Sequence, residues 1–577
     1  MRQHIVQFDF ENQPTMAFTK PVEILTTYNL HEIEIIFKKI EKALNNGYYV
    51  AGYVSYEAAP AFDSSYQVHD PSSMPLVWFG VYPDPESSLH FENNEMYQIA
   101  AWKNTISEKQ YHQNIAKIQH AISEGFTYQV NYTTRLTSHF SGDSYSYYHQ
   151  LRKNQGGTSY SAFLDIGDHQ IISVSPELFF KVHQNTITTK PMKGTVHRGG
   201  KTLAEDIQLK KGLYESEKNR AENVMIVDLL RNDLGRIAIP GSVKVKQLFN
   251  IEPYPTVHQM TSTIEAKLAA SSNVWQWFEA LFPCGSITGA PKVETMKYIK
   301  KLENSPREVY CGAIGWISPD REATFNVPIR TVWLEKETGV AYYGTGSGVT
   351  WDSSSADEYK ELIQKAAVLH ENRSAFSLLE SMLLKDGIFP LQFYHLERLQ
   401  QSAKYFHFPY KEKECKALLT EVATNYPNGC FKVRLMLNSS ELNYTIEPIQ
   451  TTTSPIKVRL AEDSIDKNNI FFYHKTTNRS IYQSFDQKLS EEHFTTLLWN
   501  NYGMVTEFTT GNVVFEKNGN YYTPPVSDGL LPGTLRAKLL EEEKITERQI
   551  RVDDIDLFER IWFINSVRGW LEVCLEV

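Results

Sequence analysis

The chain has little of several features that would assign it to a specialised class. Its 577 residues include only five cysteines, an odd number with no CxxC pair, so neither a disulfide framework nor a structural zinc site is suggested. Its formal net charge of −10 provides no basic field for a nucleic acid. No apolar run approaches the roughly 18 residues that a membrane span needs. These absences favour a soluble enzyme with no nucleic-acid or membrane partner.

Two sequence signals for other compartments or modules are also missing. Residues 1–10 mix Arg2, His4 and Asp9 with short apolar stretches, and they lack the charged start and apolar core of a signal peptide. We therefore expect a cytoplasmic location. None of the cysteines has the glycine-rich surroundings of a nucleophile elbow, so no glutamine-hydrolysing, ammonia-generating module is expected in this chain.

The length and the apolar content of the chain predict more than one domain. A chain of 577 residues with 41% hydrophobic residues exceeds what one core usually supports. A helical pattern runs from Glu358 to Leu383, with a polar break at 370–374, and we place the boundary at this break. The predicted domains are residues 1–368, with a core at 100–365, and residues 374–577.

Periodicity predicts an α+β fold for both domains. In the first domain, residues 48–56 have a strand pattern, whereas residues 108–123 and 273–282 have the pattern of amphipathic helices. The mixture lacks regular βαβ units, so we expect antiparallel sheets with flanking helices. The second domain repeats the mixture on a smaller scale, as two α+β subdomains.

A lysine stands between helix breakers in the first domain. Lys193 lies in PMKGT (191–195), sixteen positions after Glu177 in SPELF (175–179). Proline and glycine beside it place Lys193 at a strand end or a turn, with its amine available to a cleft. A solvated loop lysine is the ordinary alternative. Glu358 and Glu361, spaced i, i+3, would share one face of a helix, as expected either of a solvated face or of a Mg²⁺ site.

Several longer strings occur together in one order. They are YQVN (128–131), SPELF, PMKGT, MIVDLLRNDLG (225–235), GSITGAPK (285–292), IRT (329–331) and GTGSG (344–348). Together they resemble the chorismate-utilising enzymes, the family of anthranilate synthase component I, aminodeoxychorismate synthase component I and isochorismate synthase. The resemblance covers residues 100 to 365 strongly and the first hundred weakly.

Two positions decide which member the chain resembles. In aminodeoxychorismate synthases the lysine of the PxKGT motif attacks C2 of chorismate, and anthranilate synthases have alanine there, so Lys193 implies amination at C4. Water-using members have a lysine where Gln129 stands, which implies ammonia as the nucleophile. Glu177 is implied as the general acid or base. Desolvation would lower the pKa of Lys193 and allow the neutral amine to attack.

The resemblance also implies a metal site and a substrate site. Glu222 and Glu361 would bind Mg²⁺ directly and Glu358 through water, so that the metal neutralises the ring carboxylate. The implied substrate groups are Arg330 for the enolpyruvyl carboxylate, the amides of Gly346 and Gly348, Thr288, and His258 near the leaving hydroxyl.

A second lysine lies in another set of ordered strings. Lys475 in HKTTNR (474–479) is preceded by HLERL (395–399) and followed by VTE (505–507), GNVVF (511–515) and LLPGTLR (530–536). This order resembles the fold-type IV pyridoxal phosphate enzymes, which include branched-chain and D-amino acid aminotransferases and 4-amino-4-deoxychorismate lyase.

That resemblance implies three tasks for the cofactor-binding residues. Lys475 would hold the cofactor aldehyde and act as the catalytic base, Glu507 would keep the pyridine nitrogen protonated, and Arg398 would bind the phosphate. Gly533, Thr534 and Ser566 would complete the phosphate cup. The sequence departs from the usual Gly-Ile-Thr-Arg at residues 533–536, where it reads Gly-Thr-Leu-Arg.

The fusion makes the two expectations agree. The product expected of the first half, 4-amino-4-deoxychorismate, is the substrate of the lyase, so we expect 4-aminobenzoate and pyruvate from chorismate and ammonia, a step toward folate. A separate glutamine amidotransferase subunit would deliver the ammonia, and a homodimer through the second domain is plausible. Three alternatives stay open, namely an anthranilate-forming first half, an amino-acid aminotransferase as second half, and a non-enzymatic second half that regulates or docks.

Overall fold

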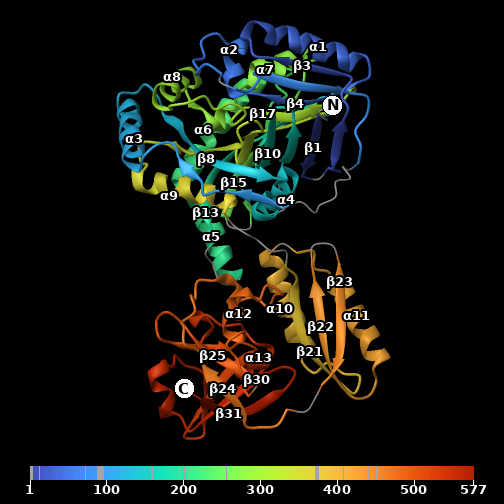
Figure 1. Cartoon of the computed structure of the whole chain (residues 1–577), viewed down its shortest axis with the longest axis vertical. Helices are drawn as coiled ribbons and strands as arrows, with labels where there is room; N and C mark the ends of the chain where they lie inside the picture. Colours follow the sequence, from blue (N-terminus) through green and yellow to red (C-terminus); the bar gives the residue numbers. More distant parts are fainter. Residues whose placement is uncertain are drawn as a thin grey trace. The chain divides into compact units, whose positions relative to one another are not determined.

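The computed structural model divides the chain into two compact units (Figure 1). The first unit comprises Met1–His197 and Lys210–Arg373, and the second comprises Arg198–Leu209 and Ser374–Val577. The predicted boundary falls largely on residues 371–375, outside the described residues. The structure describes residues 4–11, 13–71, 73–87, 96–156, 160–198, 203–254, 257–370, 376–406, 408–438, 441–449, 452–490 and 492–576.

Two large sheets build the first unit, and their described strands all pair antiparallel. The strands of one sheet are β1 (Ile5–Phe10), β2 (Met16–Thr19), β6 (Tyr97–Ile99), β7 (Lys103–Asn104), β8 (Gln129–Gly142), β9 (Tyr160–Asp165), β10 (His169–Ser175), β16 (Gly289–Ala290), β19 (Thr331–Glu335) and β20 (Val340–Val349). They run in the order β16-β8-β20-β19-β10-β9-β1-β2, with β6 and β7 also paired to β8.

The second sheet of this unit holds the predicted lysine strand. Its members are β3 (Glu23–Thr27), β4 (Tyr49–Val54), β5 (Val77–Tyr82), β11 (Leu178–His183), β12 (Thr186–Lys190), β13 (Met192–His197), β14 (Lys244–Pro253), β15 (Val257–Lys267), β17 (Ala313–Ile317) and β18 (Ala323–Asn326). The order is β13-β15-β12-β11-β18-β17-β4-β5-β3, and β14 pairs with β15.

Helices flank both sheets, as expected. They are α1 (Ile33–Asn45), α2 (Ala59–Phe62), α3 (Glu108–Ser123), α4 (Ser144–Gln155), α6 (Glu217–Gly235), α7 (Val274–Leu281), α8 (Lys292–Leu302) and α9 (Ser355–Ala366). Helix α5 (Leu203–Glu215) is divided between the units, and only its part from Lys210 onward belongs to the first. Helix α3 coincides with its predicted range, and the Ser107 side chain caps it by accepting from the Gln110 amide at 3.2 Å. In the core, the ring of Phe278 meets that of Phe325 edge to face, with centroids 5.2 Å apart.

The second unit contains a small and a large sheet. The small one orders β21 (Leu378–Lys385), β22 (Cys430–Leu437) and β23 (Leu442–Pro448), and α10 (Gln392–Phe406) and α11 (Glu412–Asn425) share a hydrophobic core with it. The large sheet contains β24 (Ile456–Leu460), β25 (Thr495–Trp499), β26 (Val505–Phe508), β27 (Gly511–Lys517), β28 (Asn520–Thr523), β29 (Thr546–Glu547), β30 (Arg560–Asn565) and β31 (Gly569–Glu576). Helices α12 (Ser480–Asp486) and α13 (Thr534–Glu541) accompany it.

These sheets and helices confirm the predicted α+β class and its antiparallel first domain. One local prediction is wrong, because the helical pattern was expected to extend to Leu383, whereas β21 begins at Leu378. None of the described helices combines the length and apolarity needed to cross a bilayer.

Candidate active sites

A cavity of about 360 Å³ in the first unit brings together most of the residues predicted for the first site. Strand β8 contributes Gln129, the turn before β11 contributes Glu177, and β13 contributes Lys193. The remaining predicted residues in its lining are Glu222, Arg330, Gly346, Gly348, Glu358 and Glu361. Segments more than two hundred positions apart therefore meet around one lysine.

The electrostatic surroundings of Lys193 favour a neutral amine. Burial lowers the pKa of Lys193, and the positive charge of Lys365 lowers it further, while Glu222 and Glu177 oppose the shift. Burial also raises the pKa of Glu177. Both pKa shifts are toward the uncharged forms, which are the forms that nucleophilic attack with acid assistance requires.

Two side chains of this cavity have buried polar atoms without partners in the described part of the chain. The oxygen and the nitrogen of the Gln129 side-chain amide both lack a hydrogen-bond partner among the described residues, and so does Oε1 of Glu177. Buried polar atoms without partners are costly, so a polar ligand or water is expected to satisfy them. Gly348 gives these groups room, because a β-carbon there would overlap Gln129 Nε2 and lie 3.1 Å from Lys193 Nζ.

Three carboxylates line the cavity where the magnesium site was expected. Burial raises the pKa of Glu222, and the negative charges of Glu358 and Glu361 raise it further. Glu358 accepts hydrogen bonds from Ser353, at 2.7 Å, and from Ser347. The clustered negative charge suits a cation in kind. Among the described residues, however, no group of three or more His, Cys, Asp or Glu side chains is arranged so that it could hold a metal ion.

Lys365 was not singled out from the sequence. Its Nζ lies 2.7 Å from Glu361 Oε1 and donates to the Gly346 carbonyl at 2.9 Å. It thereby lowers the pKa of Glu361. Its position four residues after Glu361 on α9 is the signal that would have indicated the pair.

Two predicted residues do not line this cavity. The Thr288 hydroxyl donates within its own turn, to the Cys284 carbonyl at 3.1 Å and the Gly285 carbonyl at 3.3 Å. His258 is fully buried on β15. Arg330 does line the cavity, has φ 51°, and donates to the Gln155 side chain.

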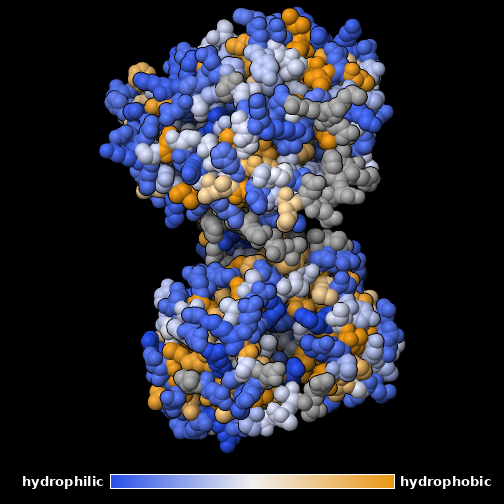
Figure 2. Space-filling model, viewed as in Figure 1, coloured by the Kyte–Doolittle hydropathy of each residue, from blue (hydrophilic) through white to orange (hydrophobic). Residues whose placement is uncertain are grey.

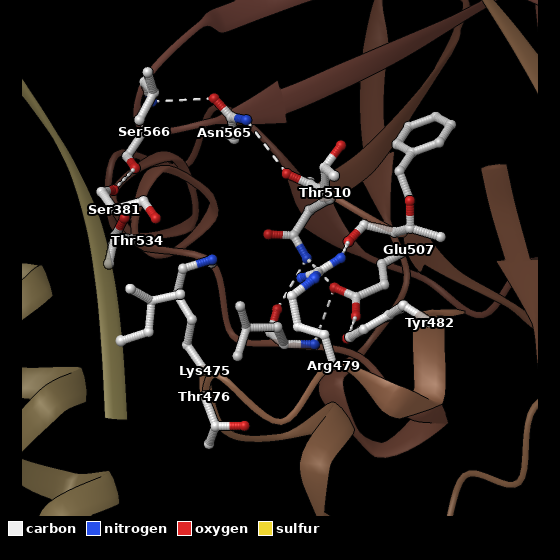
Figure 3. Close-up of a pocket in the computed structure, with 18 of the residues that line it drawn as sticks. Ser381, Lys475, Thr476, Arg479, Tyr482, Glu507, Thr510, Thr534, Asn565 and Ser566 are labelled. Carbon is white, nitrogen blue, oxygen red and sulfur yellow. Dashed lines mark hydrogen bonds between the residues drawn. The ribbon is translucent and has the colours of Figure 1, made fainter. Parts of the chain in front are cut away.

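A second cavity, of about 350 Å³, contains all the residues predicted for the cofactor. They are Arg398, Lys475, Glu507, Gly533, Thr534 and Ser566. Figure 3 shows Lys475 with its amine directed into this cavity, and Glu507 beside Tyr482 and Arg479. Burial lowers the pKa of Lys475 to about 8, and the positive charge of Arg398 contributes.

Hydrogen bonds hold the carboxyl of Glu507 in place. Burial raises its pKa to about 8, although it accepts from the Tyr482 hydroxyl at 2.9 Å and from the Leu531 amide at 3.1 Å. A cation beside this carboxyl would lower that pKa again, which fits a protonated pyridine nitrogen. Tyr482 and Arg479 were not predicted, because only the fold brings them to Glu507.

The predicted phosphate-binding residues lie in the same cavity. Gly533 precedes α13, and a β-carbon there would overlap the Asn512 side chain. Arg398 donates to Glu380 at 2.9 and 2.6 Å and to the Pro532 carbonyl at 3.0 Å. The Ser566 hydroxyl donates to the Ser381 carbonyl at 3.0 Å. Backbone and cationic donors of this kind suit a phosphate at a helix N-terminus.

Comparison with known proteins assigns each unit to a class. Residues 90–371 match the family described as chorismate binding enzyme, and residues 377–575 match the family described as amino-transferase class IV. A relative named anthranilate synthase component 1, from Saccharolobus solfataricus, is 31% identical over 338 residues, which cover 55% of this chain and 79% of the relative. The chain therefore belongs to the chorismate-binding enzyme family and carries a class IV aminotransferase domain in series.

Other relatives refine the likeness of the first unit. Aminodeoxychorismate synthase component 1 of Klebsiella aerogenes is 38% identical over 301 residues, which cover 51% of this chain. The match spans 66% of that relative, and 59% of its counterpart from Salmonella typhimurium. Anthranilate synthase component I from Streptococcus pneumoniae has the same fold, with a TM-score of 0.53 and 24% identity over 64% of this chain and 92% of its own.

Proposed function

We propose that the chain is a bifunctional enzyme that converts chorismate and ammonia to 4-amino-4-deoxychorismate and then to 4-aminobenzoate and pyruvate. One observation carries the proposal. Each unit has its own cavity with a lysine whose pKa burial lowers, and the two sets of surrounding residues suit two consecutive reactions. The domains at 1–368 and 374–577 would hold one reaction each.

In the first reaction Lys193 would add to C2 of chorismate. The C4 hydroxyl would leave as water with a proton from Glu177, whose raised pKa suits a proton donor. Ammonia would then add at C4 and expel the Lys193 amine. Gln129 has a neutral amide at this cavity and offers no base for activating water, which supports ammonia as the nucleophile.

Mg²⁺ would neutralise the ring carboxylate of chorismate. Glu222 and Glu361 would hold it directly and Glu358 through water, and the raised pKa of Glu222 in this acidic cluster supports a cation there. Arg330 would bind the enolpyruvyl carboxylate, with amides at Gly346 and Gly348 beside it. Thr288 and His258 do not line the cavity, and they would support the residues that do.

In the second cavity Lys475 would hold the aldehyde of pyridoxal phosphate. Pyridoxal phosphate, when bound, supplies an electron sink. Lys475 would take a proton from the ring, and the bond between the ring carbon and the enolpyruvyl oxygen would break. The released enolate would take up a proton to become pyruvate, and the ring would become aromatic. Glu507 would hold the pyridine nitrogen, and Arg398, Gly533, Thr534 and Ser566 would surround the phosphate.

The proposal extends to partners and location. A separate glutamine amidotransferase subunit would supply ammonia, and the class IV domain would form a homodimer. A cytoplasmic location suits the cysteines, all of which are free thiols in the structure.

A product assay tests the two reactions together. The chain is supplied with chorismate, Mg²⁺, an ammonium salt and pyridoxal phosphate, and compared with Lys193→Ala, Lys475→Ala and the exposed-lysine controls Lys244→Ala and Lys385→Ala. We expect 4-aminobenzoate from the parent and both controls, 4-amino-4-deoxychorismate from Lys475→Ala, and neither from Lys193→Ala. Formation of anthranilate by the parent, or an unchanged product with Lys475→Ala, would overturn the proposal.

A further inference from the structure

One wall of the second cavity is the open face of the small sheet. On β22 the side chains of Val433, Leu435 and Leu437 enter the core shared with α10 and α11. Alternation along a strand sends Lys432 and Arg434 to the opposite face, where both line the cavity. Arg434 stands directly opposite Ser381 in the antiparallel register with β21.

This wall lies away from the residues expected to hold the cofactor ring. Figure 3 shows Ser381 and Glu507 on opposite sides of the Lys475 amine, and Thr534 and Ser566, which are expected to surround the phosphate, lie on the Ser381 side. Because Arg434 pairs across the strands with Ser381, it belongs to the Ser381 side of the cavity. A molecule attached near Lys475 and reaching toward the small sheet would meet Arg434.

Most of the cationic side chains that line this cavity have a hydrogen-bond or ion-pair partner within the chain. Arg398 is held by Glu380, and Arg479 donates to the Thr509 carbonyl at 2.9 Å. Lys432 forms an ion pair of 2.6 Å with Glu447 on the neighbouring strand, and Arg568 donates to the Thr452 hydroxyl at 3.1 Å.

Arg434 is different. Its Nε is buried and has no hydrogen-bond partner among the described residues, and no carboxylate of the described chain lies within ion-pair distance of its guanidinium. A guanidinium offers a planar fork of donors that matches a carboxylate. The cost of a buried donor without a partner is removed when an anion binds there.

We propose that Arg434 is a specificity residue that binds a carboxylate of the substrate on the small-sheet wall of the second cavity. The inference rests on the proposed function, because 4-amino-4-deoxychorismate has two carboxylates, on the ring and on the enolpyruvyl group. A ligand with one carboxylate beside its amine would leave this subsite to water. Arg434 thereby favours a dicarboxylate substrate over a simple amino acid.

Substitutions at Arg434 test the subsite. The full chain, saturated with pyridoxal phosphate, is given 4-amino-4-deoxychorismate directly, and Arg434→Met and Arg434→Lys are compared with the parent. The matched control is Arg560→Met, which removes an arginine of 57% side-chain exposure on β30. We expect Arg434→Met to lower kcat/KM about 10- to 100-fold, mainly through KM, as expected for a lost charge-assisted hydrogen bond. Arg434→Lys should recover part of the loss, and the control should match the parent.

The cofactor provides the readout that a structural role or a phosphate-binding role would change. Pyridoxal phosphate affinity and visible absorbance should stay at parent values in Arg434→Met. An unchanged kcat/KM in Arg434→Met overturns the proposal, as does a loss of cofactor affinity equal to that of Arg398→Met.

Failure of the proposed function is distinguished by a binding measurement. If the parent does not convert 4-amino-4-deoxychorismate, the lyase assignment fails, and benzoate then serves as the probe of the cofactor-loaded chain by its effect on the visible absorbance. Binding to the parent that weakens about tenfold or more in Arg434→Met supports the carboxylate subsite. Equal binding by both chains, or binding by neither, overturns it.

Discussion

At the residue scale, the first cavity depends on a proton held by Glu177. Burial raises the pKa of this carboxyl, so more of it is protonated near neutral pH than of an ordinary glutamate. Glu177→Gln keeps the shape and removes the transferable proton. We expect amination of chorismate to fall by about 10²- to 10⁴-fold, the range typical of general acid catalysis. Stopped-time assays of 4-amino-4-deoxychorismate with saturating ammonium measure the change.

The control for this variant is Glu217→Gln, which changes an exposed glutamate on α6. This control variant should aminate chorismate to 4-amino-4-deoxychorismate at the parent rate. A Glu177→Gln chain that is as fast as the parent would show that the proton for the leaving hydroxyl comes from another group.

The pKa of Lys475 sets a pH dependence for cofactor capture. Burial lowers this pKa to about 8, so the reactive neutral amine becomes the major form above pH 8 rather than above 10.5. The rate at which the cofactor-free chain gains visible absorbance with pyridoxal phosphate should rise with pH, reach half of its limit near pH 8, and level off above about pH 9. Rapid mixing at pH 6 to 10 measures it. A rate that still rises between pH 9 and 10 would contradict the lowered pKa.

The sequence predicts side chains held by motifs better than those held by packing. Lys193, Glu177 and Gln129 meet at one cavity, as do Lys475 and Glu507, and each lies in a short string that is recognisable without a structure. Arg434 and Tyr482 acquire their positions from a neighbouring strand or helix. No local pattern specifies those contacts, so their positions follow only from the fold.

At the element scale, two glycines of β20 have different tasks. A β-carbon on Gly346 would overlap the Tyr132 carbonyl of the neighbouring strand β8, whereas one on Gly348 would meet the ends of the Gln129 and Lys193 side chains. Backbone cannot yield without loss of pairing, but flexible side chains can. We therefore expect Gly346→Ala to destabilise the first unit by about 1–3 kcal/mol. Gly348→Ala should leave its stability nearly unchanged.

The amination activity of the cavity should distinguish the same two variants in a different way from their stability, because here Gly348→Ala is the variant with the defect. Gly348→Ala moves the reactive amine, and a misplacement of this kind lowers amination by about 10- to 100-fold. Chemical denaturation measures the stability of each variant, and the amination assay measures its rate. Pyridoxal phosphate binding by the second unit is the internal control. Equal loss of stability in both variants would contradict the assignment of Gly348 to the cavity.

Element boundaries were predictable where one face of a segment is buried. Residues 108–123 form α3 as expected, because a single apolar stripe faces the core. Residues 378–385 are a strand although their apolar residues suited a helix. One face of β21 packs in the small-sheet core and the other reaches the second cavity, so both faces are apolar in part and the period of two is lost.

At the scale of the whole molecule, the order of residues and the division into units agree except in one stretch. Residues 198–209 follow the Lys193 strand in sequence but group with the second unit. There the buried Arg198 donates to Asp206 at 2.8 Å and to the Tyr405 carbonyl at 2.7 Å. A boundary placed at a polar break cannot reveal such an excursion, because it depends on contacts distant in sequence.

Each cavity is lined by residues of a single unit. This predicts that two variants, each lacking one of the two reactions, complement each other. The first cavity uses residues of the first unit only, and the second cavity residues of the second unit only. Lys193→Ala should therefore keep the lyase reaction and Lys475→Ala the amination. A mixture of the two should form 4-aminobenzoate from chorismate, Mg²⁺, ammonium and pyridoxal phosphate, after a lag that shortens as protein concentration rises. Continuous detection of 4-aminobenzoate measures the lag, and each variant alone is the control.

The lag identifies the route of the intermediate. Because the 4-amino-4-deoxychorismate made by one chain must reach the second cavity of another, its accumulation precedes product in the mixture. A parent with the same lag at the same concentration releases its intermediate to solution before using it, whereas a parent without a lag passes it on within one chain. Loss of the lyase reaction in Lys193→Ala, or of the amination in Lys475→Ala, would contradict the independence of the two cavities. A residue of one unit would then be required for the reaction of the other.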